Sequence, residues 1–354
     1  MNTGLRTSFE IIEPGHAEEV LWTDESEETD AQPESGWPGQ WRQAAVAAAE
    51  HGQRLDRALA ILVPEFSRSY LQQLIEAGAV QLNGQAARRS AAKVRVGDLL
   101  GIELKPTPQS QAFQGQEMAL AVVHEDEHLL VIDKPAGLVV HPAPGHWSGT
   151  LLNGLLAHHE AARSLPRAGI VHRLDKDTSG LMVVAKTRSA MDALVAAIAA
   201  RQVRREYLAL AHKRWQGPQT VQVDQPLGRD PRLRTRMAVV DLQRHSGKTA
   251  RTDVRLLGNS DSACWVHCQL HTGRTHQIRV HMQHLGHPLL ADELYGGRPM
   301  AGLQRQALHA WRLSLQHPVL GQAWTWQRTP PPDMAAALAE LRLGPQTPDD
   351  AELQ

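Results

Sequence analysis

The segment between residues 169 and 185 constrains the fold most, because it joins two apolar stretches through a charged turn. Residues 169–171 precede the turn, and residues 181–185, all apolar, follow it. Thr178, Ser179 and Gly180 supply turn-forming residues beside Arg173 and Asp175. The order predicts strand, charged turn, strand. On an extended backbone Arg173 and Asp175 leave the same face, so an acid is held beside a permanent cation.

An Arg-x-Asp sequence by itself is typical of a surface hairpin with a solvated ion pair, which contributes little to stability. The charge distribution favours a more specific role. Residues 1–45 carry a net charge of −8 and residues 344–354 carry −3, so residues 46–343 hold +10 although the whole chain sums to −1. A basic body with acidic ends favours a polyanionic partner. The acidic ends either compete for that basic surface or only aid solubility.

Composition limits the environment of the protein. Two cysteines provide no disulfide framework, so we expect a reducing compartment. No apolar stretch approaches the roughly 18 residues of a membrane span, and no basic start with an apolar run marks the N-terminus. We therefore expect a cytoplasmic protein without a membrane contact.

Changes in amino-acid composition along the sequence divide the chain into five parts. We expect a disordered acidic tail over residues 1–50, a small module over 51–104, a linker over 105–118, a large domain over 119–343 and an acidic tail over 344–354. In the small module, apolar spacing, capping residues and turn residues predict two helices, at 55–62 and 67–78. They also predict strands at 80–82, around 94–96 and at 99–104. Its basic side chains form an expected phosphate-binding surface, with Arg54, Arg57, Arg68 and Lys93 as candidate RNA contacts.

Strands dominate the large domain. Few of them occur in β-α-β order, so we expect an α+β domain built on a largely antiparallel sheet. Helical periodicity predicts an apolar stripe of Met191, Leu194, Val195 and Ile198. The expected elements are strands at 129–134, 138–142, 203–211 and 264–270, and helices at 189–201 and 275–285.

Three clusters in this domain combine charge with turn residues, at 171–180, 204–207 and 271–281. A zinc site is disfavoured, because Cys264 and Cys268 leave one face of their strand while His267 and His271 leave the other. A Gly-x-Gly-x-x-Gly turn after a strand and a P-loop are both lacking in the sequence, which disfavours dinucleotide, methyl-donor and ATP chemistry. We therefore expect no cofactor and no metal.

A carboxylate kept ionised by arginine can attack a sugar C1′ or stabilise an oxocarbenium-like centre there. A nearby tyrosine can stack on a base or move a proton, and arginine can hold phosphates or fill the gap of an extruded base. These groups suit cleavage and re-formation of a glycosidic bond in RNA. A serine or cysteine nucleophile is less favoured, because Ser179 has no obvious His-Asp relay and Cys264 suits a core position.

Four motifs now resemble those of the RluA family of RNA pseudouridine synthases: residues 132–142, His172 to Gly180, Arg205-Glu206-Tyr207 and Gly273 to His281. Residues 52–104 resemble the S4 RNA-binding domain, through Gln53-Arg-Leu-Asp-Arg57, Ser67 to Ile75, Val80 to Gly84 and Lys93 to Asp98. The similarity spans about residues 52–332. It implies a pseudouridine synthase catalytic domain preceded by a small S4-like α+β domain.

The resemblance also implies the site. Asp175 corresponds to the catalytic aspartate, Arg173 to the arginine associated with flipping the uridine, Tyr207 to the tyrosine that packs on the base, and Arg279 to the arginine that pairs with the aspartate. Asp175 is then interpreted as a buried carboxylate. His172, Arg274 and His276 complete the expected RNA contacts. One residue departs from the pattern, since His271 stands where an acidic residue is expected before Thr272-Gly273-Arg274.

The implied reaction detaches uracil from C1′, rotates it and rejoins it through C5 without a cofactor. We expect a monomeric enzyme that acts on structured RNA, namely 23S rRNA or large-subunit assembly intermediates. Two alternatives stay open on the sequence. One is an RNA-binding assembly factor with a vestigial pocket, which would not need an acid in a basic pocket. The other is a carbohydrate glycosidase, which would need Asp177 as its second carboxylate.

Overall fold

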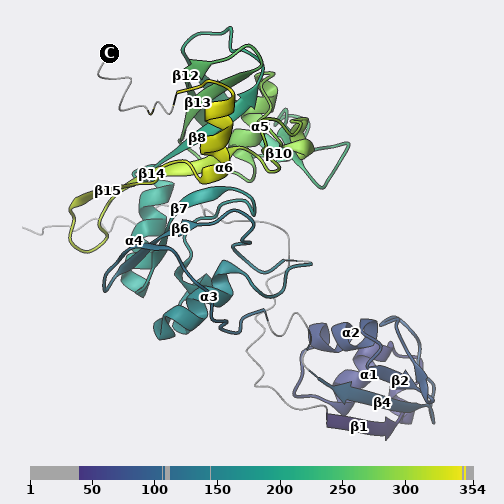
Figure 1. The fold of residues 1–354 in the computed structure, drawn as a ribbon. Coiled ribbons are helices and arrows are strands. Elements are labelled where there is room, and N and C mark those ends of the chain that lie inside the picture. The colour runs from purple at the N-terminus through teal and green to yellow at the C-terminus, as the bar shows by residue number, and fades with distance from the viewer. Residues whose placement is uncertain (1–39, 106, 108–111, 144, 345–346, 348–354) are drawn as a thin grey trace, which may run out of the picture. The chain divides into compact units, whose positions relative to one another are not determined.

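The computed structural model describes residues 40–105, 107, 112–143, 145–344 and 347 (Figure 1). The acidic tail expected before residue 40, and nearly all of the one expected after residue 343, lie outside the described residues. The described chain forms an N-terminal module and a larger domain, which are considered separately.

The N-terminal module is an antiparallel sheet of four strands, in the order β1-β4-β2-β3, with two helices packed on it. Leu55, Leu71 and Ile102 are fully buried in its core. Ser67 begins the second helix, because its hydroxyl accepts a hydrogen bond from the Tyr70 N–H at 3.2 Å. Both predicted helices are confirmed. The elements are β1 (Gln40–Ala45), α1 (Leu55–Leu62), α2 (Arg68–Glu76), β2 (Val80–Leu82), β3 (Gln85–Ala86) and β4 (Leu99–Leu104).

Two predictions for this module are wrong. Residues 40–45 form a strand that pairs with the whole of β4, although we expected disorder through residue 50. Strand pairing uses the backbone, so a segment with few large apolar residues can still complete a sheet edge. Residues 94–96 form no strand, because Asp98 turns the chain there by accepting a hydrogen bond from the Arg95 N–H at 2.7 Å, although Val94 is buried.

The larger domain is built on a nine-stranded sheet in the order β5-β6-β7-β14-β8-β13-β12-β9, with β15 paired to β14. Only β7 and β14 pair in parallel, so the predicted α+β domain with a mainly antiparallel sheet is confirmed. Its strands are β5 (Val122–Glu125), β6 (Leu129–Lys134), β7 (Ser179–Ala185), β8 (Arg204–His212), β9 (Thr220–Asp224), β12 (Arg251–Asn259), β13 (Ala263–Leu270), β14 (Leu308–Gln316) and β15 (Ala323–Gln327). A separate ribbon joins β10 (Leu227–Arg229) to β11 (Met237–Val239).

Helices cover both faces of this sheet (Figure 1). Side chains alternate along β8, so Tyr207 and Ala209 pack in one apolar cluster while Leu208 and Leu210 pack in another. The Tyr207 face is covered by α3 (Leu151–His158) and α5 (Gln277–His284), and the opposite face by α4 (Arg188–Ala199) and α6 (Pro332–Glu340).

Two details differ from the prediction in this domain. Val195 is 40% exposed, so the apolar stripe of α4 is narrower than expected. Residues 138–142 form no strand, because the carbonyls of Val139 and Val140 accept hydrogen bonds from Leu151 and Leu152 at the start of α3.

Candidate active site

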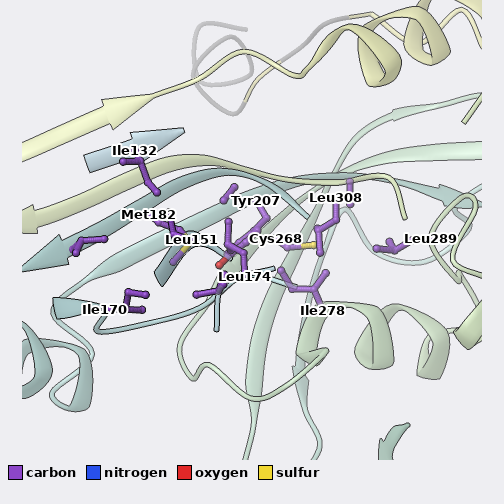
Figure 2. Packing of buried hydrophobic residues seen from close by; sticks show 14 of the residues in the cluster. Ile132, Leu151, Ile170, Leu174, Met182, Tyr207, Cys268, Ile278, Leu289 and Leu308 are labelled. Carbon is purple, nitrogen blue, oxygen red and sulfur yellow. The ribbon is translucent and has the colours of Figure 1, made fainter. Parts of the chain in front are cut away.

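Asp175 lies in the loop that leads from Ile170, which bridges to Val184, into β7. Its neighbour Leu174 is buried in the same apolar cluster as Tyr207, which anchors the loop immediately before the carboxylate (Figure 2). The Asp175 side chain is 19% exposed. The expectation of a buried carboxylate therefore needs correction to a partly buried one, as contact with a substrate requires.

Lys134, at the end of β6, stabilises this loop through hydrogen bonds to backbone carbonyls. Its ammonium group is fully buried and donates three hydrogen bonds of 2.8–2.9 Å, so every N–H has an acceptor. Burial lowers the pKa of Lys134 to about 8, although the nearby Asp175 carboxylate acts in the opposite direction. The acceptors are the carbonyls of Pro135, Leu138 and Lys176, so one side chain ties the turn after β6 to the Asp175 loop.

Arg279 on α5 divides its guanidinium between two carboxylates. One terminal nitrogen lies 3.1 Å from Asp175 Oδ2, while Nε and the other nitrogen each donate a 2.8 Å hydrogen bond to Asp292. Both Arg279 and Asp292 are buried. Burial alone would lower the pKa of Arg279, but the two carboxylates hold it above its usual value. Arg279 is therefore a permanent cation. Asp292 fixes its position, and the terminal nitrogen that Asp292 does not bind contacts Asp175.

His276 lies beside Asp175, and Tyr295 contacts both His276 and Arg279. His276 Nδ1 is 2.8 Å from the Tyr295 hydroxyl, and His276 Nε2 is 3.9 Å from Asp175 Oδ1. The Arg279 guanidinium lies 5.0 Å from the centre of the Tyr295 ring. Burial lowers the pKa of His276, so its neutral form is favoured at neutral pH. The structure thus places His276 beside the candidate catalytic carboxylate.

Tyr207 lies on β8 in the same apolar cluster as Leu174 of the loop, and 5% of its surface is exposed (Figure 2). Burial raises the pKa of Tyr207 to about 12; Arg205 acts against this shift and the Asp175 carboxylate adds to it. The phenol therefore stays protonated at neutral pH and can donate a hydrogen bond.

The other expected site residues differ in exposure. Arg173 is exposed, whereas the carboxylate two residues later is in contact with Arg279. His172 is buried, and its Nε2 accepts a hydrogen bond from the Val183 N–H at 3.1 Å. Arg274 is partly buried and donates from Nε to the Thr249 carbonyl at 3.1 Å. Roles of these residues in RNA binding stay predictions.

In the N-terminal module, the candidate RNA contacts Arg54, Arg57, Arg68 and Lys93 are all exposed. Arg54 and Arg68 also share a buried partner, since they lie 3.0 and 2.9 Å from the Asp56 carboxylate. Burial would raise the pKa of Asp56, but the hydrogen bonds from Arg54, Gln72 and Arg68 hold it well below its usual value. Asp56 therefore orients two of the predicted phosphate-binding side chains.

Several of these residues were not predicted as parts of a site. Asp292 and Tyr295 follow α5 in a segment without a recognised motif, and Lys134 lies inside one but was given no role. The unexpected His271 lies 2.7 Å from Asp253 on the neighbouring strand, so its contact is with β12. It lies outside the group formed around Asp175.

No group of three or more His, Cys, Asp or Glu in the described part of the chain is arranged to hold a metal ion. Cys264 and Cys268 are buried in β13, and burial raises the pKa of both thiols. His267 on the opposite face instead lies 2.8 Å from Glu206. Within the described residues, no helix is long and apolar enough to cross a membrane.

Comparison with known proteins shows the family to which the chain belongs. The RNA pseudouridylate synthase family matches residues 128–284, and the S4 domain matches residues 53–100. Ribosomal large subunit pseudouridine synthase D of Nitrosomonas europaea is 47% identical over 304 residues, which cover 84% of this chain and 86% of that protein. The protein of the same name from Yersinia pestis is 44% identical over 314 residues, with 84% and 94% covered.

A solved structure agrees with these relatives. Human RNA pseudouridylate synthase domain containing 1 has a TM-score of 0.50 and 25% identity, and the match covers 66% of this chain and 98% of that one. The chain therefore belongs to the RNA pseudouridylate synthase family, and it is an enzyme that isomerises uridine in RNA to pseudouridine. The similarity to pseudouridine synthase D that its motifs indicate, and the presence of an S4 domain, are confirmed.

Proposed function

We propose that Asp175 is the catalytic carboxylate, that Arg279 orients it, that Tyr207 packs on the base, and that Arg173 holds the uridine out of its stack. The observation that carries this proposal is the division of Arg279 between Asp292 and Asp175. Asp292 takes two of its hydrogen bonds, and the accessible Asp175 takes one. Arg279 therefore holds the partly exposed Asp175 carboxylate in a fixed orientation from which it can contact a substrate.

The reaction breaks the N1–C1′ bond of uridine and forms a C5–C1′ bond. The C5 proton leaves, and N1 gains a proton. The Asp175 carboxylate either attacks C1′ or stabilises positive charge that develops there, and both routes need its ionised form. The protonated Tyr207 phenol is a hydrogen-bond donor beneath this position. Asp175 supplies the carboxylate and Tyr207 supplies the hydrogen-bond donor. The proposed reaction needs no second carboxylate at the reacting centre.

The substrate we propose is 23S rRNA or an assembly intermediate of the large subunit, which accords with the names of the relatives. We further propose that residues 51–104, extended by the strand at 40–45, bind RNA phosphates with little sequence preference. Residues 105–118 then serve as a linker, 119–343 as the catalytic domain, and both ends of the chain as acidic tails. The enzyme acts as a cytoplasmic monomer, and His172, Arg274 and His276 contribute to RNA binding.

The test is pseudouridine formation in a 23S rRNA transcript by the purified full chain, with Asp175→Asn as the variant and Asp177→Asn as the matched control. We expect no product from Asp175→Asn, RNA affinity near that of the wild type, and near-normal activity from Asp177→Asn. Activity in Asp175→Asn would refute the role of Asp175. Loss of activity in Asp177→Asn alone would favour a different carboxylate.

A further inference from the structure

Arg205 is a buried cation for which the described residues supply no counter-charge. It lies on β8 two residues before Tyr207 and on the same face, about 7 Å away along the strand. Only 6% of its surface is exposed, and its Nε is buried without a hydrogen-bond partner. The Arg205 side chain forms no hydrogen bond and no ion pair with any residue that the structure describes.

The groups around Arg205 are basic as well. Burial lowers the pKa of Arg274, and the nearby Arg201 and Arg205 lower it further. Burial also lowers the pKa of His172 to about 3, and Arg205 acts in the same direction. Arg201 and Arg205 therefore both lie within electrostatic range of Arg274, and the described residues place no carboxylate on Arg205.

A second buried donor accompanies Arg205. His172 Nε2 accepts the Val183 N–H, so the neutral ring carries its proton on Nδ1. That Nδ1 is also buried without a partner in the described chain. Two unsatisfied donors in one electropositive region indicate an acceptor that the protein itself does not supply.

The backbone leaves room for the guanidinium. A Cβ added at Gly273 would lie 2.7 Å from a terminal nitrogen of Arg205, closer than real contacts allow. The glycine of the Thr272-Gly273-Arg274 motif thus leaves space that the Arg205 guanidinium occupies. The glycine between β13 and α5 therefore accommodates the buried Arg205 guanidinium.

An unpaired buried arginine is costly, because a buried charge without its partner destabilises the folded state. A phosphate offsets that cost better than a neutral carbonyl does, since it brings negative charge and several acceptors that match the guanidinium fork. We propose that Arg205, with Arg274 and Arg201, binds a backbone phosphate of the RNA beside the target uridine. This inference rests on the proposed function, because it assigns a substrate contact to the same site.

The test compares Arg205→Met with the wild type and with Arg188→Met, which removes the same charge from the exposed surface of α4. Binding of a 23S rRNA transcript to the full chain is measured between 50 and 200 mM KCl. Each lost phosphate contact should reduce the slope of log Kd against log salt by on the order of 1. We expect this loss in Arg205→Met and a smaller one in Arg188→Met.

Thermal unfolding without RNA separates binding from structure. Removal of an uncompensated buried cation should leave the Tm of Arg205→Met unchanged or raise it. Arg205→Gln serves if the methionine variant does not fold, and the same loss of slope is expected. A wild-type slope in the variant that folds would overturn the inference, and so would weaker binding with an unchanged slope, which points to a neutral acceptor.

Pseudouridine formation by the wild type in the same preparation keeps the two hypotheses distinct. An active wild type with an unaltered slope in the Arg205 variant overturns the phosphate contact alone. Absence of product from the wild type on this transcript overturns the proposed substrate, whatever the Arg205 variants show.

Discussion

Replacement of Asp292 by Asn should destabilise the catalytic domain far more than replacement of Asp175 by Asn. Both carboxylates contact Arg279, but their surroundings differ. Asp292 is buried and accepts two hydrogen bonds of 2.8 Å, whereas Asp175 is 19% exposed and accepts one of 3.1 Å. The two substitutions remove the same charge from the same arginine, so each serves as a control for the other.

The magnitude follows from burial. Removing one partner of a buried ion pair costs about 3–5 kcal/mol, and we take about 3 because the amide that replaces the carboxylate in Asp292→Asn keeps one acceptor oxygen. For a domain of this size, 1 kcal/mol shifts Tm by about 2–4 °C, so Asp292→Asn should lower Tm by roughly 6–12 °C. Asp175→Asn loses one partly exposed hydrogen bond, about 1 kcal/mol, and should lower Tm by roughly 2–4 °C.

Thermal unfolding followed by circular dichroism measures this difference, and pseudouridine formation is assayed well below either Tm. Asp292→Asn should reduce kcat by about 10- to 100-fold, because Arg279 is no longer fixed and small displacements of catalytic groups are costly. Asp175→Asn should be inactive. Equal Tm values for the two variants, or a wild-type Tm for Asp292→Asn, would refute the view that Asp292 anchors the arginine.

Three further predictions follow from the same geometry. Arg173→Ala should lower kcat and leave Tm unchanged, because the side chain is exposed; a normal kcat would remove Arg173 from the base-flipping step. Lys134→Met should lower Tm by several degrees and reduce activity, since three partly buried hydrogen bonds lose their donor; a wild-type Tm or a wild-type turnover rate would contradict this prediction. The pKa of Tyr207 is raised above its unfolded value, so its contribution to stability should be full below about pH 10 and lost as pH rises through about 12. Tyr207→Phe should therefore flatten the alkaline fall of Tm, and an unchanged profile would contradict the assignment.

The fold was predictable where local patterns determine it. The helices at Leu55–Leu62 and Arg68–Glu76 follow from apolar spacing and from the Ser67 cap, and both are local properties. The strand at Gln40–Ala45 was missed because its place depends on pairing with β4, some 60 residues later. The strand predicted at 138–142 does not form for a similar reason, since backbone N–H groups at the start of α3 donate hydrogen bonds to carbonyls of this segment. Periodicity does not show which distant backbone an edge will meet.

The candidate site divides in the same way. Asp175, Tyr207 and Arg279 lie in motifs that can be recognised in the sequence, and the structure brings Arg279 to Asp175 across 104 positions. Asp292 and Tyr295 have no such motif, and their parts in the site arise only when the segment after α5 folds back on that helix. Strand alternation alone predicts that Arg205 lies on the same face as Tyr207. That its Nε has no hydrogen-bond partner among the described residues is a property of the folded chain.

The arrangement around Arg279 explains how the Asp175 carboxylate can be both paired with a cation and accessible to a substrate. If Asp175 were the sole anion on Arg279, the arginine would move whenever the carboxylate reacted. Asp292 instead holds Nε and one terminal nitrogen, and the ring of Tyr295 lies against the same guanidinium, so the third edge stays in place whether or not Asp175 occupies it. The positive charge is therefore fixed in advance, which is the condition under which electrostatic stabilisation needs no reorganisation during the reaction. Asp175 can then form and lose a bond to C1′, or only approach it, without disturbing the arginine that orients it.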